Sequence, residues 1–113
     1  MSPLVLKDPG LFRQHCLIDG EWVGAAGKEV IAVTNPASGE TLGHVPNLGG
    51  EQTGQAILAA HRALSGWRRK TAQERATILR NWFQLLLANQ EDLAMLMTAE
   101  QGKPLAEARG EIA

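Results

Sequence analysis

Cysteine is the residue type in this sequence best suited to nucleophilic chemistry, and the chain has one, Cys16, directly after His15. A catalytic thiol needs a neighbouring base or cation in order to ionise at neutral pH. The surrounding residues favour a strand, in which adjacent side chains point to opposite faces, so His15 is badly placed to activate Cys16. We therefore predict a packed, non-catalytic thiol. A single cysteine also excludes an internal disulfide bond and a cysteine-based zinc site.

The other groups that could bind a metal or transfer protons are scattered. Glu107 and Glu111 share one helix face, where they repel weakly, and Glu100 has no partner spaced for acid–base catalysis. The sequence lacks the phosphate-binding, serine-hydrolase and zinc-protease motifs. We predict no catalytic and no cofactor-binding residue in this chain, and metal binding stays open. The histidines are far apart and lack metal-ligand spacing: His15, His44 and His61.

The charge of the chain is nearly balanced, with 11 Lys and Arg against 12 Asp and Glu, which gives a formal net charge of −1. Its one basic run, Arg68-Arg69-Lys70, lies between two predicted helices. There its positive charge interacts favourably with the dipole at the C-terminal end of the first helix. We therefore expect no nucleic-acid partner. The longest apolar run, Ala56–Ala60, is far too short to cross a membrane. We expect no membrane partner. Because the single cysteine cannot form an internal disulfide bond, the reducing cytoplasm is the expected location.

Short strands are predicted over residues 15–46. β-prone residues flank Asp19-Gly20, a dipeptide that adopts the positive φ angles of a type I′ turn, so we predict a tight hairpin there. Val30–Thr34 and Thr41–Val45 predict two further strands, each ended by a proline. Upstream of them, Leu11–Gln14 predicts a short turn of helix.

Three to four helices are predicted over residues 51–113. Apolar residues recur at helical spacing from about Glu51 to Arg68, and Thr71-Ala72-Gln73-Glu74 predicts a capping box that starts a second helix. The second helix carries a wide apolar stripe suited to burial, and we expect its aromatic residues, with Trp67, to lie in a core. The stripe consists of Ile78, Leu79, Trp82, Phe83, Leu85 and Leu86.

The last predicted helices have recognisable ends. Asn89 is expected to cap the third helix, Gly102 to end it, and Pro104 to suit the first turn of a fourth. Apolar residues then recur at helical spacing as far as Ile112, and the sequence stops at Ala113 without a cap or a polar tail. We therefore expect a truncated sequence.

Three segments stand out when they are read together: residues 18–22 (IDGEW), 33–40 (VTNPASGE) and 100–108 (EQGKPLAEA). They resemble the N-terminal part of the aldehyde dehydrogenase superfamily. A fourth, residues 74–83 (ERATILRNWF), is similar to the semialdehyde branch of that family. The resemblance extends over essentially the whole chain from Leu11 onward.

The resemblance implies an α/β parent enzyme that oxidises an aldehyde to an acid with NAD or NADP, for which succinate semialdehyde and glutarate semialdehyde are alternative substrates. In the family a cysteine thiolate attacks the aldehyde, a glutamate activates water, and an asparagine amide and a backbone N–H hold the oxyanion. All of those segments lie beyond the end of this sequence. Cys16 does not occupy the nucleophile's position, so we expect the chain alone to be inactive and to bind no cofactor.

The resemblance also implies structural roles. Residues 1–113 would form the N-terminal part of the nucleotide-binding region, packed against the remainder of their own polypeptide, in a parent that forms a homo-oligomer. In some relatives a monovalent cation lies near positions that match Val33 and Glu100, with a third ligand beyond this sequence. The residues alone leave another interpretation open, a freestanding helical module that recruits a partner protein through its apolar stripes.

Overall fold

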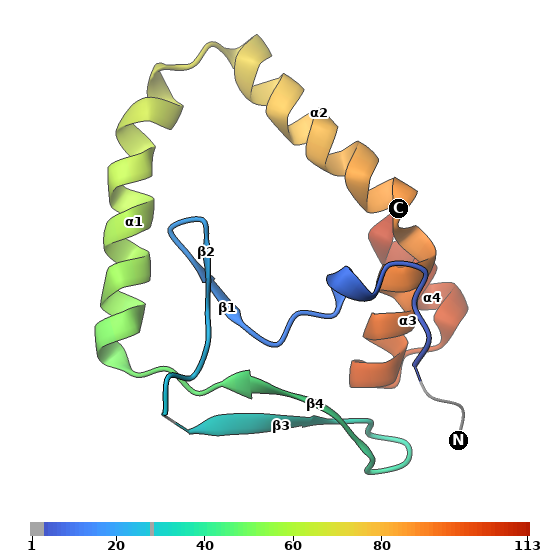
Figure 1. Cartoon of the computed structure of the whole chain (residues 1–113). Coiled ribbons are helices and arrows are strands. Elements are labelled where there is room, and N and C mark those ends of the chain that lie inside the picture. Colours follow the sequence, from blue (N-terminus) through green and yellow to red (C-terminus); the bar gives the residue numbers. More distant parts are fainter. Residues whose placement is uncertain (1–3, 28) are drawn as a thin grey trace. The chain divides into compact units, whose positions relative to one another are not determined.

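A computed structural model describes residues 4–27 and 29–113 of the chain (Figure 1). Within these residues a 3₁₀ turn and four short strands precede four helices, which confirms the expected order of elements. The elements are η1 (Pro9–Leu11), β1 (Cys16–Ile18), β2 (Glu21–Val23), β3 (Val30–Thr34), β4 (Thr41–Pro46), α1 (Gly50–Arg69), α2 (Ala72–Ala88), α3 (Gln90–Gln101) and α4 (Leu105–Ile112).

The described chain divides into two compact units, which we treat separately. The first contains residues 4–13, Ala32–Gly43 and Asn81–Ala113, and the second contains Gln14–Ile31 and His44–Arg80. The first unit therefore holds α3 and α4, and the second holds the β1–β2 pair and α1.

The β1–β2 hairpin of the second unit forms where the sequence predicts it. Its strands pair antiparallel, with Leu17 opposite Trp22. Asp19 and Gly20 have φ angles of 52° and 78°, the left-handed values that a type I′ turn requires. Arg62 of α1 donates to the Asp19 carboxylate at 3.2 Å, but both side chains are exposed, so this ion pair adds little stability. The hairpin therefore depends mainly on its turn.

β3 and β4 form a second antiparallel pair. The turn that joins them is closed by hydrogen bonds between its own residues. The N–H of Gly39 donates to the carbonyl of Asn35 at 2.8 Å, and the N–H of Asn35 donates to the carbonyl of Glu40 at 2.8 Å. The Asn35 side chain also accepts the N–H of Ala37. Such turns set strand register, so this pair too is specified locally.

The start of α2 is the predicted capping box. The N–H of Thr71 donates to the Glu74 carboxylate at 2.7 Å, and the N–H of Glu74 donates to Thr71 Oγ1 at 3.2 Å. The bond from the Thr71 backbone, and then that from its side chain, hold the pKa of Glu74 below its ordinary value. Arg68 and Arg69 lie in the last turn of α1, as expected, where positive charge suits the helix dipole.

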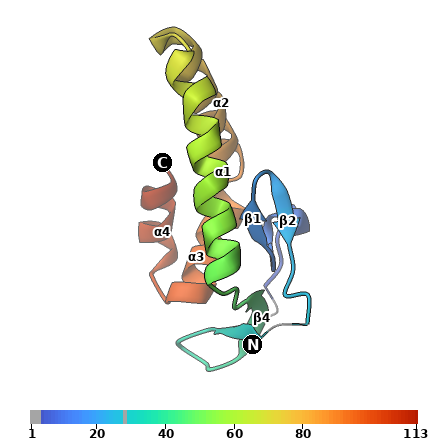
Figure 2. The same ribbon diagram turned by 90° about the vertical axis from the view of Figure 1, so that its left-hand side faces the viewer.

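Helices α3 and α4 pack against each other in the first unit (Figures 1 and 2). Ala94 and Ala108 are fully buried, and small side chains of this kind allow two helices to approach closely. Gly102 ends α3 as predicted, with a left-handed φ of 81°. A Cβ atom at Gly102 would lie only 3.0 Å from the ring of Pro36. Glycine is therefore required there both for its conformation and for its size.

Two local predictions are wrong. Asn89 precedes α3, as expected, but its side chain does not cap that helix, because Nδ2 donates back to the carbonyl of Leu85 at 2.9 Å. The turn predicted over Leu11–Gln14 instead occupies Pro9–Leu11, because Asp8 caps it with its side chain and proline suits its first position.

The described chain buries few hydrophobic side chains, and the expected core position of the α2 aromatic residues is wrong within it. Trp82 is 63% exposed and Phe83 is 43% exposed. Trp67 is half-buried. The buried hydrophobic residues are three alanines: Ala59, Ala94 and Ala108.

We predict that Gly102→Ala lowers the free energy of unfolding more than Gly20→Ala. An alanine costs about 1–2 kcal/mol at either left-handed position, but only Gly102 has a neighbouring ring against which the new methyl group would press. Urea denaturation of the two variants measures the difference. Equal losses, or a more stable Gly102→Ala variant, would contradict the contact with Pro36.

Candidate functional site

Cys16 lies on β1, half-buried and with a free thiol. It lines a cavity of about 350 Å³ in the second unit, beside Gln52, whose Oε1 is buried without a hydrogen-bond partner among the described residues. The residues that line this cavity include no histidine, lysine or arginine that could activate a thiol. This environment suits a packed thiol.

The three histidines lie on different segments. The ring of His15 lies beside Gly24, the backbone N–H of His44 on β4 donates to the Gln14 side chain at 2.8 Å, and His61 is exposed on α1. The described part of the chain holds no group of three or more His, Cys, Asp or Glu that could bind a metal ion.

The positions at which the resemblance implies cation ligands both belong to the first unit. Val33 is half-buried on β3, and Glu100 is exposed in the last turn of α3. Hard cations take several oxygen ligands, so two positions alone would not complete a site. The monovalent cation site therefore stays a prediction.

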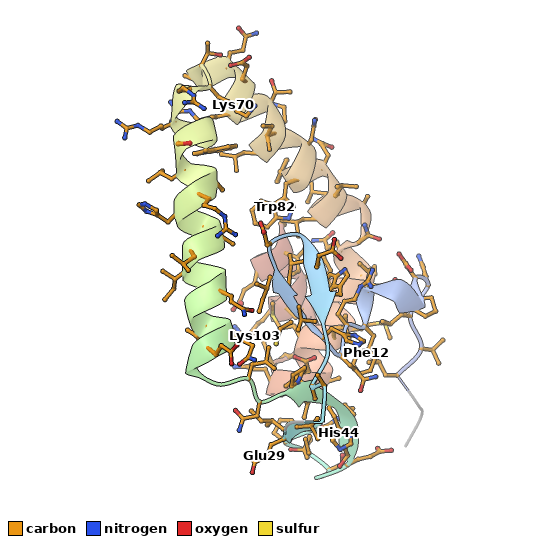
Figure 3. All side chains as sticks on the ribbon, turned by 60° about the vertical axis from the view of Figure 1, so that its left-hand side comes forward. Phe12, Glu29, His44, Lys70, Trp82 and Lys103 are labelled. Carbon is orange, nitrogen blue, oxygen red and sulfur yellow. The ribbon has the colours of Figure 1, made fainter. Side chains whose placement is uncertain are left out.

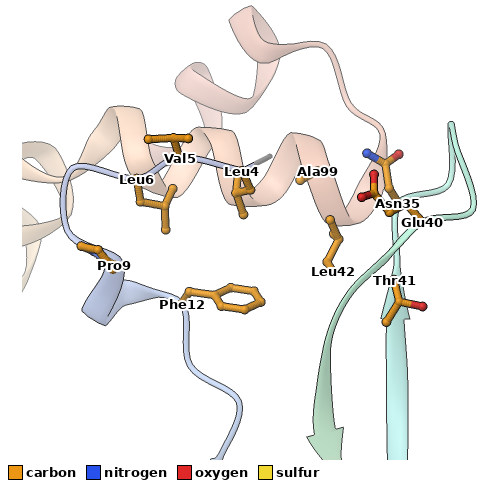
Figure 4. Close-up of a pocket in the computed structure, with 10 residues that line it drawn as sticks. All are labelled: Leu4, Val5, Leu6, Pro9, Phe12, Asn35, Glu40, Thr41, Leu42 and Ala99. Atoms are coloured by element: carbon orange, nitrogen blue, oxygen red, sulfur yellow. The ribbon is translucent and has the colours of Figure 1, made fainter. Parts of the chain in front are cut away.

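A cavity of about 540 Å³ lies in the first unit (Figure 4). Glu40 is the charged residue among those that line it, and it lies with Asn35 at one end. An anionic side chain repels phosphate, so these walls do not suit the pyrophosphate of a dinucleotide. The other walls are mostly apolar, including Leu4, Leu6, Phe12, Leu42 and Ala99.

Asp92 makes the longest-range polar contact of the first unit. Its carboxylate belongs to a residue only 5% exposed and accepts the N–H groups of Asp8 at 2.8 Å and Lys7 at 2.9 Å. The bond from Asp8, and then that from Lys7, lower the pKa of Asp92. In the sequence, Asp92 is one of two acidic residues in the first turn of a helix, which is a common pattern. This pattern does not indicate that Asp92 contacts Asp8, 84 residues away.

Glu91 and Arg109 join α3 to α4, which the sequence did not indicate. The Nε and Nη2 atoms of Arg109 donate to the two carboxylate oxygens of Glu91 at 2.8 and 2.9 Å. This bidentate bond lowers the pKa of Glu91 and raises that of Arg109. Gln90 also donates to the carbonyl of Arg109 at 2.9 Å. The start of α3 thereby holds the end of α4.

The expected repulsion between Glu107 and Glu111 is offset by a contact that the sequence analysis missed. Glu111 forms an ion pair with Lys103, which Figure 3 labels. A cation beside one of two like charges weakens their repulsion. The pair anchors the end of α4 to the segment before it and is structural in character.

The exposed face of α2 is the most extensive candidate for a contact surface. We call it the α2 stripe, and Trp82 on this helix is labelled in Figure 3. Exposed apolar patches of this kind mark contact surfaces. No helix in the described ranges is both long and apolar enough to cross a membrane. The stripe comprises Ile78, Leu79, Trp82, Phe83 and Leu85, each at least 43% exposed.

Comparison with known proteins identifies relatives over nearly the whole chain. The model of the aldehyde dehydrogenase family matches residues 22–113. The chain is 63% identical over 107 residues to the NADP(+) succinate-semialdehyde dehydrogenase of Escherichia coli K12, covering 95% of this chain. It is 58% identical to a 3-sulfolactaldehyde dehydrogenase and to a glutarate-semialdehyde dehydrogenase, both of Pseudomonas putida, each over 96% of this chain. The chain spans only 22% of the length of each of these relatives.

Solved structures give the same result. An Escherichia coli NADP-dependent enzyme superposes with a TM-score of 0.92 at 62% identity, over 96% of this chain and 22% of that one. A betaine aldehyde dehydrogenase from Staphylococcus aureus, solved with NAD+, superposes with a TM-score of 0.83 at 34% identity, over 88% of this chain and 20% of that one.

We predict that the 113-residue chain binds 1-anilinonaphthalene-8-sulfonate and self-associates, because the α2 stripe is exposed. Replacing Trp82 and Leu85 together by glutamine should reduce the dye fluorescence by about half, since these two side chains form much of the stripe. Gln84→Ser, on the same helix, is the control and should leave the fluorescence unchanged. Equal fluorescence from the double variant and the unaltered chain would exclude the stripe as the dye site.

Proposed function

Because the chain belongs to the aldehyde dehydrogenase family, we propose that it is the N-terminal segment of a dehydrogenase that oxidises succinate semialdehyde to the dicarboxylate with NAD or NADP. The observation that carries this proposal is the 63% identity to a succinate-semialdehyde dehydrogenase over nearly the whole chain. Glutarate semialdehyde is the alternative substrate, supported by 58% identity to an enzyme named for it.

The names of the relatives support a substrate class more strongly than a single substrate. Succinate and glutarate semialdehydes carry a carboxylate at the end opposite the aldehyde, and 3-sulfolactaldehyde carries a sulfonate there. An aspartate-semialdehyde dehydrogenase at 53% identity fits the same description. We propose that the parent enzyme takes short aldehydes with an anionic group at the far end.

The described residues of this chain are proposed to supply no group to the reaction. Their 540 Å³ cavity is mostly apolar and carries a carboxylate at one end, so it does not suit a nicotinamide dinucleotide. Cys16 lies in a cavity whose lining residues include no base or cation to activate it. The nicotinamide cofactor and the reacting residues therefore belong, in this proposal, to the rest of the parent polypeptide.

The role proposed for this chain is packing. The α2 stripe would bury against the remainder of the same polypeptide, since residues 1–113 account for only about a fifth of the length of the relatives. Burial of this stripe would supply the hydrophobic stabilisation that the described chain lacks. We also propose that the parent forms a homo-oligomer.

The competing proposal is a freestanding helical module that recruits a different protein through the α2 stripe. The same exposed side chains would serve either partner, so the two proposals differ in what lies beyond Ala113. The reading frame downstream of the Ala113 codon distinguishes the two proposals. A continuation with the asparagine, glutamate and cysteine segments of the family supports the enzyme, and a stop codon supports the module.

We predict that the polypeptide encoded by the extended reading frame reduces NAD+ or NADP+ with succinate semialdehyde. Butanal has the same number of carbons without the carboxylate, so it is the matched control and should give a kcat/KM lower by about a hundredfold. Absorbance of the reduced nicotinamide is the measurement. Equal rates with both aldehydes would refute the anionic substrate class, and turnover by residues 1–113 alone would refute the packing role.

We predict that Cys16→Ser leaves kcat of the extended polypeptide within about twofold of the unaltered enzyme, because Cys16 belongs to β1 and touches no reacting group in this proposal. Steady-state kinetics with succinate semialdehyde test this expectation. Loss of nearly all activity in Cys16→Ser would identify this thiol as the nucleophile and overturn our assignment.

A further inference from the structure

The first described residues of the chain form an extended segment with one inward face. Leu4 and Leu6 are half-buried, whereas Val5 is 69% exposed and Lys7 is exposed. This alternation is the period of two that extended backbone produces when one face packs against protein. The 3₁₀ turn follows, and the segment ends at Phe12, which is half-buried. We call residues 4–12 the N-terminal strap.

The apolar side chains of the strap face the 540 Å³ cavity. Leu4 and Leu6 project into it from one end of the strap and Phe12 from the other, and Leu42 of β4 lies opposite them (Figure 4). Ala99 of α3 completes the apolar wall. The strap thus covers an apolar space that it does not fill.

One carboxylate fastens the strap to α3. Asp92 accepts both the Lys7 and the Asp8 backbone N–H, and within the described residues these two are the hydrogen bonds that join residues 4–12 to another segment. The other bonds of the strap are internal, as when the Asp8 side chain accepts the N–H of Gly10 at 2.9 Å. The polar attachment of nine residues is therefore concentrated on one side chain.

We propose that the strap is a detachable cover that the Asp92 carboxylate holds over the apolar cavity. When this carboxylate no longer accepts the Lys7 and Asp8 N–H groups, the strap separates from α3 while α3 stays folded. The α3–α4 packing does not use the strap, since it depends on Ala94, Ala108 and the bond between Glu91 and Arg109. Loss of the Asp92 bonds therefore leaves that packing in place. The cover controls access to the cavity.

Protonation is one way to release the strap, and its direction follows from the charges around Asp92. The lowered pKa of Asp92 means that the attachment is complete above the ordinary aspartate pKa and is lost as the pH falls through the lowered value. The charge of Lys7 favours the charged form of the Asp92 carboxylate, and burial of this carboxylate opposes that form. Glu91 on the same helix is neutralised by Arg109 of α4.

Asp92→Asn tests the strap directly by amide hydrogen exchange. An amide side chain keeps one acceptor oxygen but turns an NH₂ group toward the second N–H, so protection of the Lys7 and Asp8 amides should fall about tenfold. The Gly102 amide, which donates to Thr98 in α3, should keep its protection. Glu91→Gln is the matched control, since it removes a carboxylate from the same turn that accepts its hydrogen bonds from Arg109 and none from the strap, and Lys7 acts on it only through charge.

Three results would overturn the proposal. Protection at Lys7 and Asp8 could be unchanged in Asp92→Asn, or Glu91→Gln could lower it equally. Protection at Gly102 could also be lost together with protection at Lys7 and Asp8, which would show that the strap and α3 open as one unit.

The unaltered chain provides a second test that needs no variant. Between about pH 5 and about pH 1, protection factors at Lys7 and Asp8 should fall before that at Gly102, because neutral Asp92 is a weaker acceptor. A simultaneous fall at all three amides would contradict a separate strap, as would a Lys7 amide that stays protected after the Gly102 amide has lost protection.

Discussion

Two long helices of this chain, α1 and α2, expose most of their large apolar side chains, and this shortage of hydrophobic burial is the constraint that matters most for the structure. Most helical stability in proteins comes from packing of an apolar face. Here the buried hydrophobic residues are alanines, while Trp82 and Leu85 are each 63% exposed. The start of α2 is therefore defined by a feature that needs no core, the capping box at Thr71. In our proposal, further hydrophobic burial comes from the remainder of the parent polypeptide.

The features that could be predicted from the sequence are the local ones. Asp19-Gly20 demands positive φ angles, so the hairpin and its register follow from two residues. The capping box spans four residues, and Gly102 followed by Pro104 is enough to end α3. In each case the groups that interact are neighbours in the chain. The family could be predicted for a similar reason, since its motifs are short continuous segments.

The features that could not be predicted depend on residues far apart in the chain. Asp92 binds backbone N–H groups 84 and 85 residues away, and Arg109 finds Glu91 across 18 residues, contacts that no local pattern indicates. Asn89 shows the converse. Its residue type is typical of a helix cap, but its side chain donates to the carbonyl of Leu85 in the preceding helix instead. The exposure of the α2 stripe could be expected from the resemblance, which implies packing against sequence beyond Ala113, whereas the amphipathic pattern alone predicts a buried face without indicating what buries it. Of the candidate site, two expectations could be formed beforehand: that Cys16 is a bystander, and that the apolar stripe of the second helix is a packing surface.

The central claim is that the α2 stripe packs against the remainder of the same polypeptide. Its most direct test is the rate of maleimide labelling of Leu85→Cys in a Cys16→Ser background, compared between the 113-residue chain and the polypeptide encoded by the extended reading frame. Packing of the stripe predicts labelling slower by about tenfold or more in the longer polypeptide, because the thiol is then covered. Equal labelling rates in the two polypeptides would contradict the claim.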